Sequence, residues 1–259
     1  MTYVDRQTIS GSGLDHQVTV YSLNYNVPDS AFPSAVEVTG CDGFCPNDLV
    51  IPSTIDGKTV VSIGAESFSA PAGDGEISSL SLPSTLKTIG QTAFRGNSLT
   101  SISVPSSVTS IGEAAFADNQ LTSVTLPDSI INFGSAIFLG NQLTSFSLPD
   151  YLSSVPPSFV AHNKLTSITI HDGVTNIGYG AFRSNHLTSV TIPDGVTSIG
   201  DKAFDRNQLT SVIIGDSVKS IGVQAFGFNK LTDVIFPASV TNVERYMFYN
   251  NPGAGQIKE

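Results

Sequence analysis

Few residue types in this chain of 259 residues could carry out chemistry, and their spacing gives them little opportunity. The two cysteines, Cys41 and Cys45, lie together in the segment GCDGFCP. Cysteines this close in sequence can form a small disulfide loop in an oxidising compartment, whereas a metal site needs two further soft ligands, and none lies nearby. We therefore favour a disulfide, with free thiols as the alternative, and we predict no metal site.

The other reactive residue types show no catalytic spacing. The histidines are His16, His162, His171 and His186. They lack the paired spacing of metal ligands, and the chain has no G-x-S-x-G, H-E-x-x-H or phosphate-binding loop motif. We expect the protein not to be an enzyme and to need no cofactor.

Acidic residues recur at a fixed interval and could bind calcium if they stacked. They are Asp128, Asp150, Asp172, Asp194 and Asp216. Aspartate directly after a strand more often forms a turn, which is the interpretation we favour.

Most of these residues belong to one repeated unit, typified by LTSVTIPDGVTSIGDKAFDRNQ at residues 187–208. Eight such units of 22 residues run in register over residues 77–252. Apolar residues at positions 1, 4 and 6 indicate a strand, and the proline that is common at position 7 ends it because proline cannot donate a backbone hydrogen bond. A second apolar set at positions 10, 13, 17 and 18 predicts the opposite wall of a coil. So short a period predicts a solenoid whose strands form a parallel sheet between neighbouring coils.

Three positions have structural interpretations. Position 18 is phenylalanine in seven of the eight units, which predicts a column of rings along the core. Position 14 is glycine in six units, as expected for a tight backbone bend or a positive φ. Position 21 is asparagine in all eight, and we expect each buried amide to bond the backbone of a neighbouring coil. The fourth unit departs from the pattern, because VPPSFV at residues 155–160 moves the aromatic residue by one position.

The pattern LxxVxIPxxVxxIGxxAFxxN resembles the BspA-like, or treponemal-type, leucine-rich repeats over about residues 49–252. The resemblance implies a curved solenoid from a secreted or cell-surface protein that works in adhesion and recognition. Many members carry cysteine near position 21, where this chain has only asparagine. We predict a β-rich repeat solenoid, a right-handed curved coil with a parallel sheet on its concave side and a β cap at the N-terminus.

The expected domain organisation follows the limits of the repeat. Residues 1–48 do not fit it, and alternation at residues 17–23 and 35–39 predicts a hairpin-like cap. Residues 49–76 form an irregular first coil, residues 77–252 the eight repeats, and residues 253–259 a short tail.

Charge and hydropathy exclude several classes of partner. The chain has 12 basic and 22 acidic residues, a net charge of -10, which disfavours nucleic acid and anionic membranes. No apolar run approaches the length of a transmembrane helix, so we expect no membrane insertion. Met1 leads into polar sequence, so this chain shows no signal peptide, although one removed earlier would leave no trace.

The outward strand positions 3 and 5 give the best indication of a binding surface. Serine and threonine fill them in most units and predict ladders of hydroxyl groups. The central ladder residues are Ser123, Thr125, Ser145, Ser147, Ser167, Thr169, Ser189 and Thr191. Such rows occur in ice-binding solenoids, but small hydroxyl side chains also suit the crowded inner face of a curved sheet.

The last two units break these ladders. Position 5 becomes Ile213 and Ile235, and position 3 becomes Asp233 in the last unit. Adjacent exposed apolar residues tend to mark contacts, so we expect this end to bind a protein or glycan ligand or a second copy of the chain. The alternative is that a C-terminal tail or a continuation of the chain covers them. The candidate site comprises Ile213, Asp233, Ile235, Phe228, Tyr246 and Tyr249. The predicted function is a non-enzymatic extracellular or cell-surface recognition module, with a passive structural spacer or an ice-binding protein as alternatives.

Overall fold

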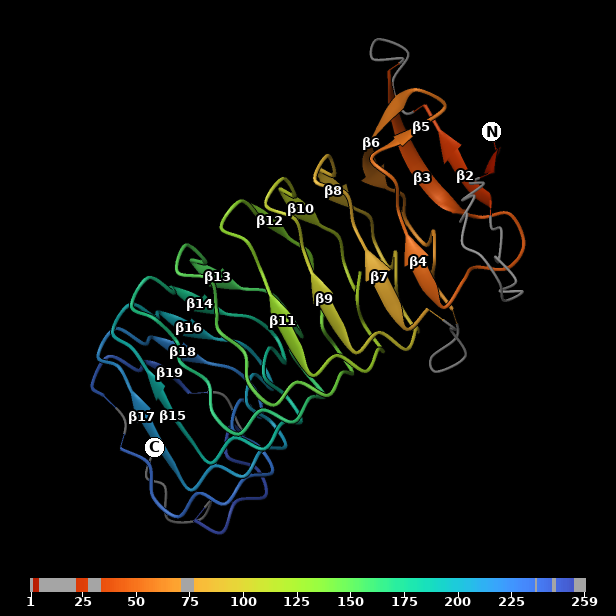
Figure 1. The fold of residues 1–259 in the computed structure, drawn as a ribbon. Coiled ribbons are helices and arrows are strands. Elements are labelled where there is room, and N and C mark those ends of the chain that lie inside the picture. The colour runs from red at the N-terminus through yellow and green to blue at the C-terminus, as the bar shows by residue number, and fades with distance from the viewer. Residues whose placement is uncertain are drawn as a thin grey trace.

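The structure is a computed structural model that describes residues 2–4, 22–27, 34–70, 77–235, 237–243 and 246–253. The chain winds into an elongated stack of coils that begins at an N-terminal group of strands (Figure 1). Within the described residues every regular element is a strand. Paired residues of neighbouring coils are 22 positions apart, as in Ser110 and Asn132. The predicted β-rich solenoid with parallel pairing is therefore confirmed.

The N-terminal strands join the solenoid edge to edge. Strands β1 (Thr2–Val4), β2 (Ser22–Asn26) and β3 (Ala35–Cys41) are antiparallel, and β3 pairs in parallel with β6 (Lys58–Ile63). A short strand, β5 (Thr54–Ile55), turns back antiparallel onto β6. Of the first strand expected in the cap, residues 17–21 lie outside the described residues and residues 22–23 belong to β2.

The inner strands occupy positions 3 to 6 of their units. They are β4 (Asp48–Val50), β7 (Ser79–Ser81), β9 (Ser101–Ser103), β11 (Ser123–Thr125), β15 (Ser189–Ile192) and β17 (Ser211–Ile214). They pair in parallel as β4 with β7, β9 with β11, and β15 with β17. The inner sheet is thus a series of short pairs rather than one continuous sheet.

A second set of parallel strands forms at positions 12 and 13, on the wall that the sequence places opposite the inner sheet. These strands are β8 (Thr88–Ile89), β10 (Ser110–Ile111), β12 (Asn132–Phe133), β13 (Ser154–Val155), β14 (Asn176–Ile177), β16 (Ser198–Ile199), β18 (Ser220–Ile221) and β19 (Asn242–Val243). One run continues from β6 to β12, and the other joins β13 to β19. This second run of strands adds to the predicted parallel sheet, because the backbone of this wall also lies within hydrogen-bonding distance of its neighbours.

The core contains the predicted column of rings. Phe94 stacks on Phe116 with ring centroids 5.5 Å apart, and Phe204 stacks on Phe226 at 5.4 Å. All four side chains are fully buried. The column is interrupted in the fourth unit, where Phe159 meets Phe138 edge to face at 5.9 Å.

The position-21 asparagines form the predicted ladder, and each is buried. Asn207 donates through Nδ2 to the carbonyl oxygens of Phe182 (3.0 Å) and Phe204 (3.1 Å). Its Oδ1 accepts the backbone N–H of Leu187 at 3.1 Å. One amide therefore satisfies backbone groups of two neighbouring coils, which explains its recurrence without any ligand.

The position-14 glycines are required by close packing, not by a positive φ. A Cβ on Gly112 would lie 2.5 Å from the backbone nitrogen of Gln91 in the preceding coil. Positive φ occurs instead at positions 16 and 20, for example at Lys202 (56°) and Phe228 (51°). Of the two explanations offered for these glycines, positive φ was wrong.

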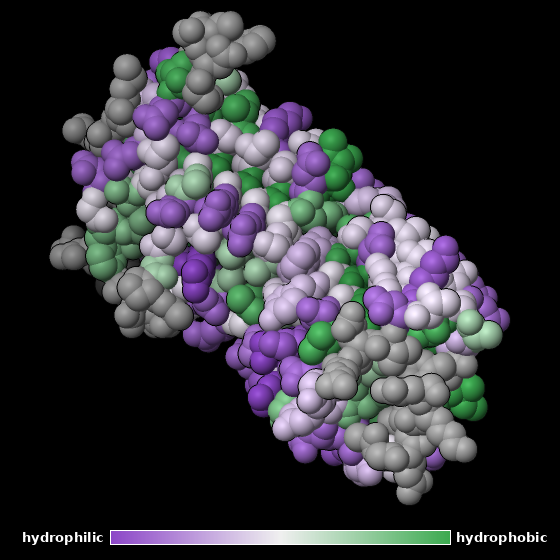
Figure 2. All heavy atoms as spheres, turned by 180° about the vertical axis from the view of Figure 1, so that it is seen from behind, coloured by the Kyte–Doolittle hydropathy of each residue, from purple (hydrophilic) through white to green (hydrophobic). Residues whose placement is uncertain are grey.

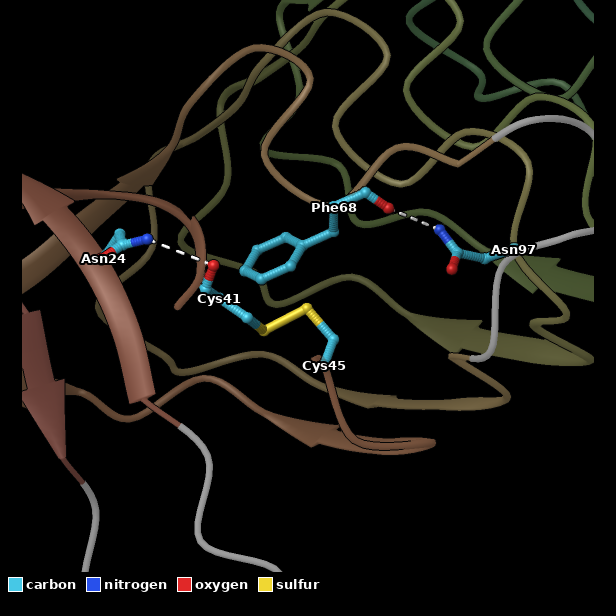
Figure 3. The surroundings of a disulfide bond; sticks show 5 residues. All are labelled: Asn24, Cys41, Cys45, Phe68 and Asn97. Carbon is cyan, nitrogen blue, oxygen red and sulfur yellow. Dashed lines mark hydrogen bonds between the residues drawn. A yellow bond between two sulfur atoms is a disulfide. The ribbon is translucent and has the colours of Figure 1, made fainter. Parts of the chain in front are cut away.

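Cys41 and Cys45 form a disulfide with Cα atoms 5.5 Å apart. Figure 3 shows it beside Phe68, the ring that stacks on Phe94 at 5.3 Å. The carbonyl of Phe68 accepts a hydrogen bond from Asn97, and that of Cys41 accepts one from Asn24. The disulfide therefore lies where the N-terminal strands meet the first ring of the column.

Candidate functional site

The face seen in Figure 2 shows hydrophobic side chains in several separate areas among polar ones. A candidate site must therefore be identified from individual residues that interrupt the repeat. Two groups of the residues predicted above do so, and the structure places each in a defined environment.

The first group lies on the inner sheet. Ile213 and Ile235 are 65% and 88% exposed, and both line a groove of about 410 Å³. Asp233 and Asp216 also line it. Pairing of β15 with β17 places Ile213 directly beside Thr191, so the groove begins where the hydroxyl ladder ends. The groove combines exposed aliphatic side chains with two carboxylates.

The second group lies on the turns at positions 16 to 20. Tyr249 packs its ring edge to face against Phe228 at 5.3 Å and against Tyr246 at 5.9 Å. The guanidinium of Arg206 lies over the Phe228 ring at 4.5 Å. None of these residues lines the groove described above. The six residues that we expected to form one surface thus belong to two groups.

The hydroxyl ladder is present but irregular. Ser101 pairs with Ser123 and Ser103 with Thr125, and these side chains are exposed. Residues 145–147 and 167–169, which carry the next four hydroxyl groups, are not in strands. A cleft of about 370 Å³ separates Ser123 and Thr125 from Ser145 and Ser147. The ladder is therefore not carried by one continuous run of paired strands, which disfavours a regular water-ordering surface.

The cleft marks a seam between the third and fourth units. Phe133 and Phe146 replace smaller aliphatic residues at positions 13 and 4, and both meet Phe159 edge to face at 5.5 and 5.6 Å. A second cleft of about 300 Å³, lined by Phe133 and Tyr151, opens where β12 and β13 fail to pair. The large rings hold the two coils apart on two sides.

A buried carboxylate that sequence reasoning missed lies beside the second group. Asp205 accepts a hydrogen bond from Nε of Arg183 at 3.0 Å, and Nε of Arg206 lies 3.7 Å from the same oxygen. Its side chain is only 2% exposed, and Oδ1 has no hydrogen-bond partner among the described residues. Burial raises the pKa of Asp205, against the opposing effect of the two arginines.

The neighbouring side chains fit this arrangement. Burial lowers the pKa of His162, and Arg183 and Arg206 lower it further. A Cβ on Gly227 would lie 2.9 Å from Oδ1 of Asp205, so glycine makes room for the carboxylate. The signal in the sequence was the placement of Arg183, Asp205 and Gly227 at position 19 of three successive units.

The aspartates after the inner strands have a local role. The carboxylate of Asp194 accepts the backbone N–H of Asp216 in the next coil at 2.9 Å. No group of metal-binding side chains occurs within the described ranges. The same part of the chain contains no helix that is long and apolar enough to cross a membrane.

The sequence pattern of the repeats matches a known family model. Residues 61–186 and 156–257 match the BspA type leucine rich repeat region, a model of six copies. The chain belongs to the BspA-type leucine-rich repeat family. Proteins of this family and fold are typically surface or protein-interaction modules and are generally not enzymes. A search of curated proteins gives no match.

Solved structures share the fold of this BspA-type chain. A leucine-rich repeat protein from Bacteroides ovatus is similar over 87% of this chain, with a TM-score of 0.73 and 24% identity. This chain covers 60% of that protein, so it spans less than two thirds of its length. The pneumococcal vaccine antigen PcpA matches over 90% of this chain and 73% of its own, with a TM-score of 0.62 and 21% identity. A leucine rich cell surface protein from Faecalibacterium prausnitzii matches over 96% of this chain and 89% of its own, with a TM-score of 0.56 and 20% identity.

Proposed function

We propose that this protein is a non-enzymatic recognition module, exposed at a cell surface or secreted, that binds a protein partner through the groove around Ile213 and Ile235. The observation that carries the proposal is the local change of a repeated surface. Six consecutive units present serine or threonine at position 5, and the next two present isoleucine. Two structurally similar proteins are a cell surface protein and a vaccine antigen, which supports the proposed location.

The chemistry of the groove favours a protein over a neutral glycan. Two exposed isoleucines offer aliphatic surface, which protein partners bury when they bind. Asp216 and Asp233 at the same groove offer acceptors for basic or polar groups of the partner. Isoleucine side chains that are mostly exposed contribute little to the stability of the fold, so their role is best explained by a contact.

The test is a double change that restores the repeat consensus. Ile213→Ser with Ile235→Ser should leave the melting temperature within a few degrees and weaken binding to a host-cell surface about tenfold or more. The matched control is Thr169→Ala with Thr191→Ala on the hydroxyl ladder, which should leave binding unchanged. Sedimentation of both variants determines whether the groove instead joins two copies of the chain.

If the isoleucine variant binds like the parent protein while the threonine variant does not, the contact lies on the hydroxyl ladder and the proposal is wrong. If neither variant changes any interaction, and whole coils can be deleted without consequence, the protein is a structural spacer.

A further inference from the structure

The second group of residues forms a surface with a different chemistry from the groove. We call it the arginine–tyrosine ridge, defined as Arg183, Arg206, Phe228, Tyr246 and Tyr249. A ladder of backbone hydrogen bonds links successive coils along this edge, including Arg206 N to Gly227 O (2.9 Å) and Phe228 N to Tyr249 O (2.7 Å). Side chains at positions 19 and 20 of neighbouring coils are therefore held next to one another.

The backbone of the ridge adopts a conformation that large side chains disfavour. Position 20 has a positive φ in every unit, which favours glycine, asparagine and aspartate. The first five units have small or turn-forming residues there: Gly96, Asp118, Gly140, His162 and Ser184. The sixth and seventh have Arg206 and Phe228, with φ of 56° and 51°. The backbone conformation at these points disfavours an arginine and a phenylalanine, so another contact must account for them, and we attribute them to a ligand.

The same change occurs at position 16, the other left-handed position. There the early units have small residues, but Lys202 and Tyr246 occupy it in the sixth and eighth units, with φ of 56° and 67°. Lys202 lies 5.9 Å from the centroid of the Tyr179 ring. Cationic and aromatic side chains thus gather along one edge of the last coils.

The buried carboxylate of Asp205 orients the two arginines of the ridge. Both approach Oδ2 of buried Asp205 through Nε, and within the described residues their Nη groups donate no hydrogen bond to the protein. Two arginines against one aspartate leave one positive charge in a chain whose net charge is -10. Guanidinium Nη groups bind carboxylate and sulfate groups in a bidentate fashion. The ridge is therefore prepared for an anion.

The aromatic rings near the arginines indicate which class of ligand bears the anionic group. Tyr246 and Tyr249 are 62% and 46% exposed. The face of an exposed tyrosine ring packs well against the C–H face of a pyranose sugar. A peptide would need a strand edge or a groove, but the ridge is a row of turns whose N–H groups bond the next coil.

We propose that the arginine–tyrosine ridge binds an acidic polysaccharide. Its carboxylate or sulfate groups pair with Arg183 and Arg206, and a neighbouring sugar ring packs on Tyr246 or Tyr249. This site is separate from the isoleucine groove, so the two proposals can fail independently.

The chain offers a matched control for the test. Arg95 pairs through Nε with Asp118 at 3.0 Å, and a Cβ on Gly140 of the next coil would meet that carboxylate, as at the ridge. The acidic partner of this early pair, Asp118, lies at position 20 instead of position 19. The pair has the same Nε to Oδ2 distance as the pair at the ridge, but no exposed tyrosines lie beside it among the described residues. Arg95→Gln therefore removes an arginine from an equivalent pair outside the ridge.

The experiment measures binding of the full chain to heparin-derived and hyaluronan oligosaccharides, with dextran and polyglutamate as controls, at two salt concentrations. We expect binding to at least one acidic polysaccharide, weaker at high salt, and none to dextran or polyglutamate. Arg206→Gln and Tyr249→Ala should each weaken binding about tenfold, while Arg95→Gln and the Ile213→Ser, Ile235→Ser pair leave it unchanged.

Arg206→Gln keeps the Arg183 to Asp205 pair, so it should fold, and a melting curve checks this. If Arg206→Gln does not fold, Tyr249→Ala tests the proposal in its place. Absence of binding to both acidic polysaccharides overturns the proposal. So does equal binding of polyglutamate, which would indicate a peptide or charge alone, and so does a loss in Arg95→Gln as large as in Arg206→Gln.

Discussion

The first three repeats and the last four are built on the same interior but carry different exteriors. Phe94 and Phe116 stack within 4° of parallel, and Phe204 and Phe226 within 3°. The exteriors diverge at positions 5, 16 and 20, where isoleucine, lysine, arginine, phenylalanine and tyrosine replace small residues in the later units. Stacking fixes the inward positions, so only the outward ones are free to acquire a ligand.

The early and late repeats can also be compared through their arginine–aspartate pairs, Arg95 with Asp118 and Arg183 with Asp205. Both have an Nε to Oδ2 distance of 3.0 Å, yet the aspartate side chain is 25% exposed in the early pair and 2% in the late one. Ion pairs that share a geometry can therefore differ in chemistry, because the surrounding side chains set their solvation.

The largest expected effects test whether the two interiors are equivalent. Phe116→Ala and Phe204→Ala should each lower the free energy of unfolding by roughly 3–5 kcal/mol, because each leaves a cavity in a stacked column. Denaturant titration measures both. Lys202→Ala, on the surface of the same coil as Phe204, should stay within roughly 0.5 kcal/mol. A loss at Phe204 much smaller than at Phe116 would mean that the late column is more loosely packed.

The next effect concerns the asparagine ladder. Asn119→Ala and Asn207→Ala should each cost about 2–3 kcal/mol, since each leaves a buried backbone N–H and carbonyl groups without partners. Gln208→Ala, at the half-buried next position, is the control and should be nearly neutral, because it removes only a side-chain hydrogen bond with Lys230. Different losses at the two asparagines in the same titrations would show that the ladder is not uniform along the stack.

The interior could be predicted from sequence because the same inward-facing residue types recur at the same positions of nearly every repeat. Eight asparagines at one position left a structural ladder as the simplest explanation, and the phenylalanine column followed from the same phase. The second run of strands was missed because only two residues per unit pair there, too few to show alternation. Left-handed positions 16 and 20 were missed because they carry twelve different residue types and only three glycines, Gly96, Gly140 and Gly180.

The candidate surfaces were harder to predict, for a physical reason. Ile213 and Ile235 were found because the ladder register makes position 5 a neighbour of position 5 in the next coil. Asp205 was not found, because its burial depends on Arg183, Arg206 and the space left by Gly227. Such three-coil arrangements have no signature in one repeat.

A smaller effect is expected at the seam that separates the two regions. Amides of residues 145–148, which lie at the open cleft and outside any strand, should exchange with solvent at least about tenfold faster than those of β17. Hydrogen exchange measured by mass spectrometry can compare the two segments directly. Equal protection would show that the clefts beside Phe133 and Phe146 do not weaken the stack.

The smallest expected effect is a pH dependence of the unfolding free energy that comes from Asp205. Burial, opposed by Arg183 and Arg206, raises the pKa of Asp205 above its usual value of 3.8. A carboxyl whose pKa is higher in the folded chain favours folding while it is protonated, and this contribution is lost as pH rises from the unfolded pKa through the folded one. Asp205→Asn keeps the shape without the charge.

The unfolding free energy of Asp205→Asn should therefore improve relative to the parent as pH rises from about 3 to 7, by less than about 1 kcal/mol. Asp118→Asn removes the partly exposed partner of Arg95 and should stay within roughly 0.5 kcal/mol of the parent at neutral pH. Denaturant titrations across this pH range measure both variants. If the parent instead gains on Asp205→Asn as pH rises, the two arginines outweigh burial, and Asp205 stabilises the fold as well as orienting the ridge. If it does not, the charge on Asp205 is maintained at a cost in stability, which a ligand-binding role for Arg183 and Arg206 would explain.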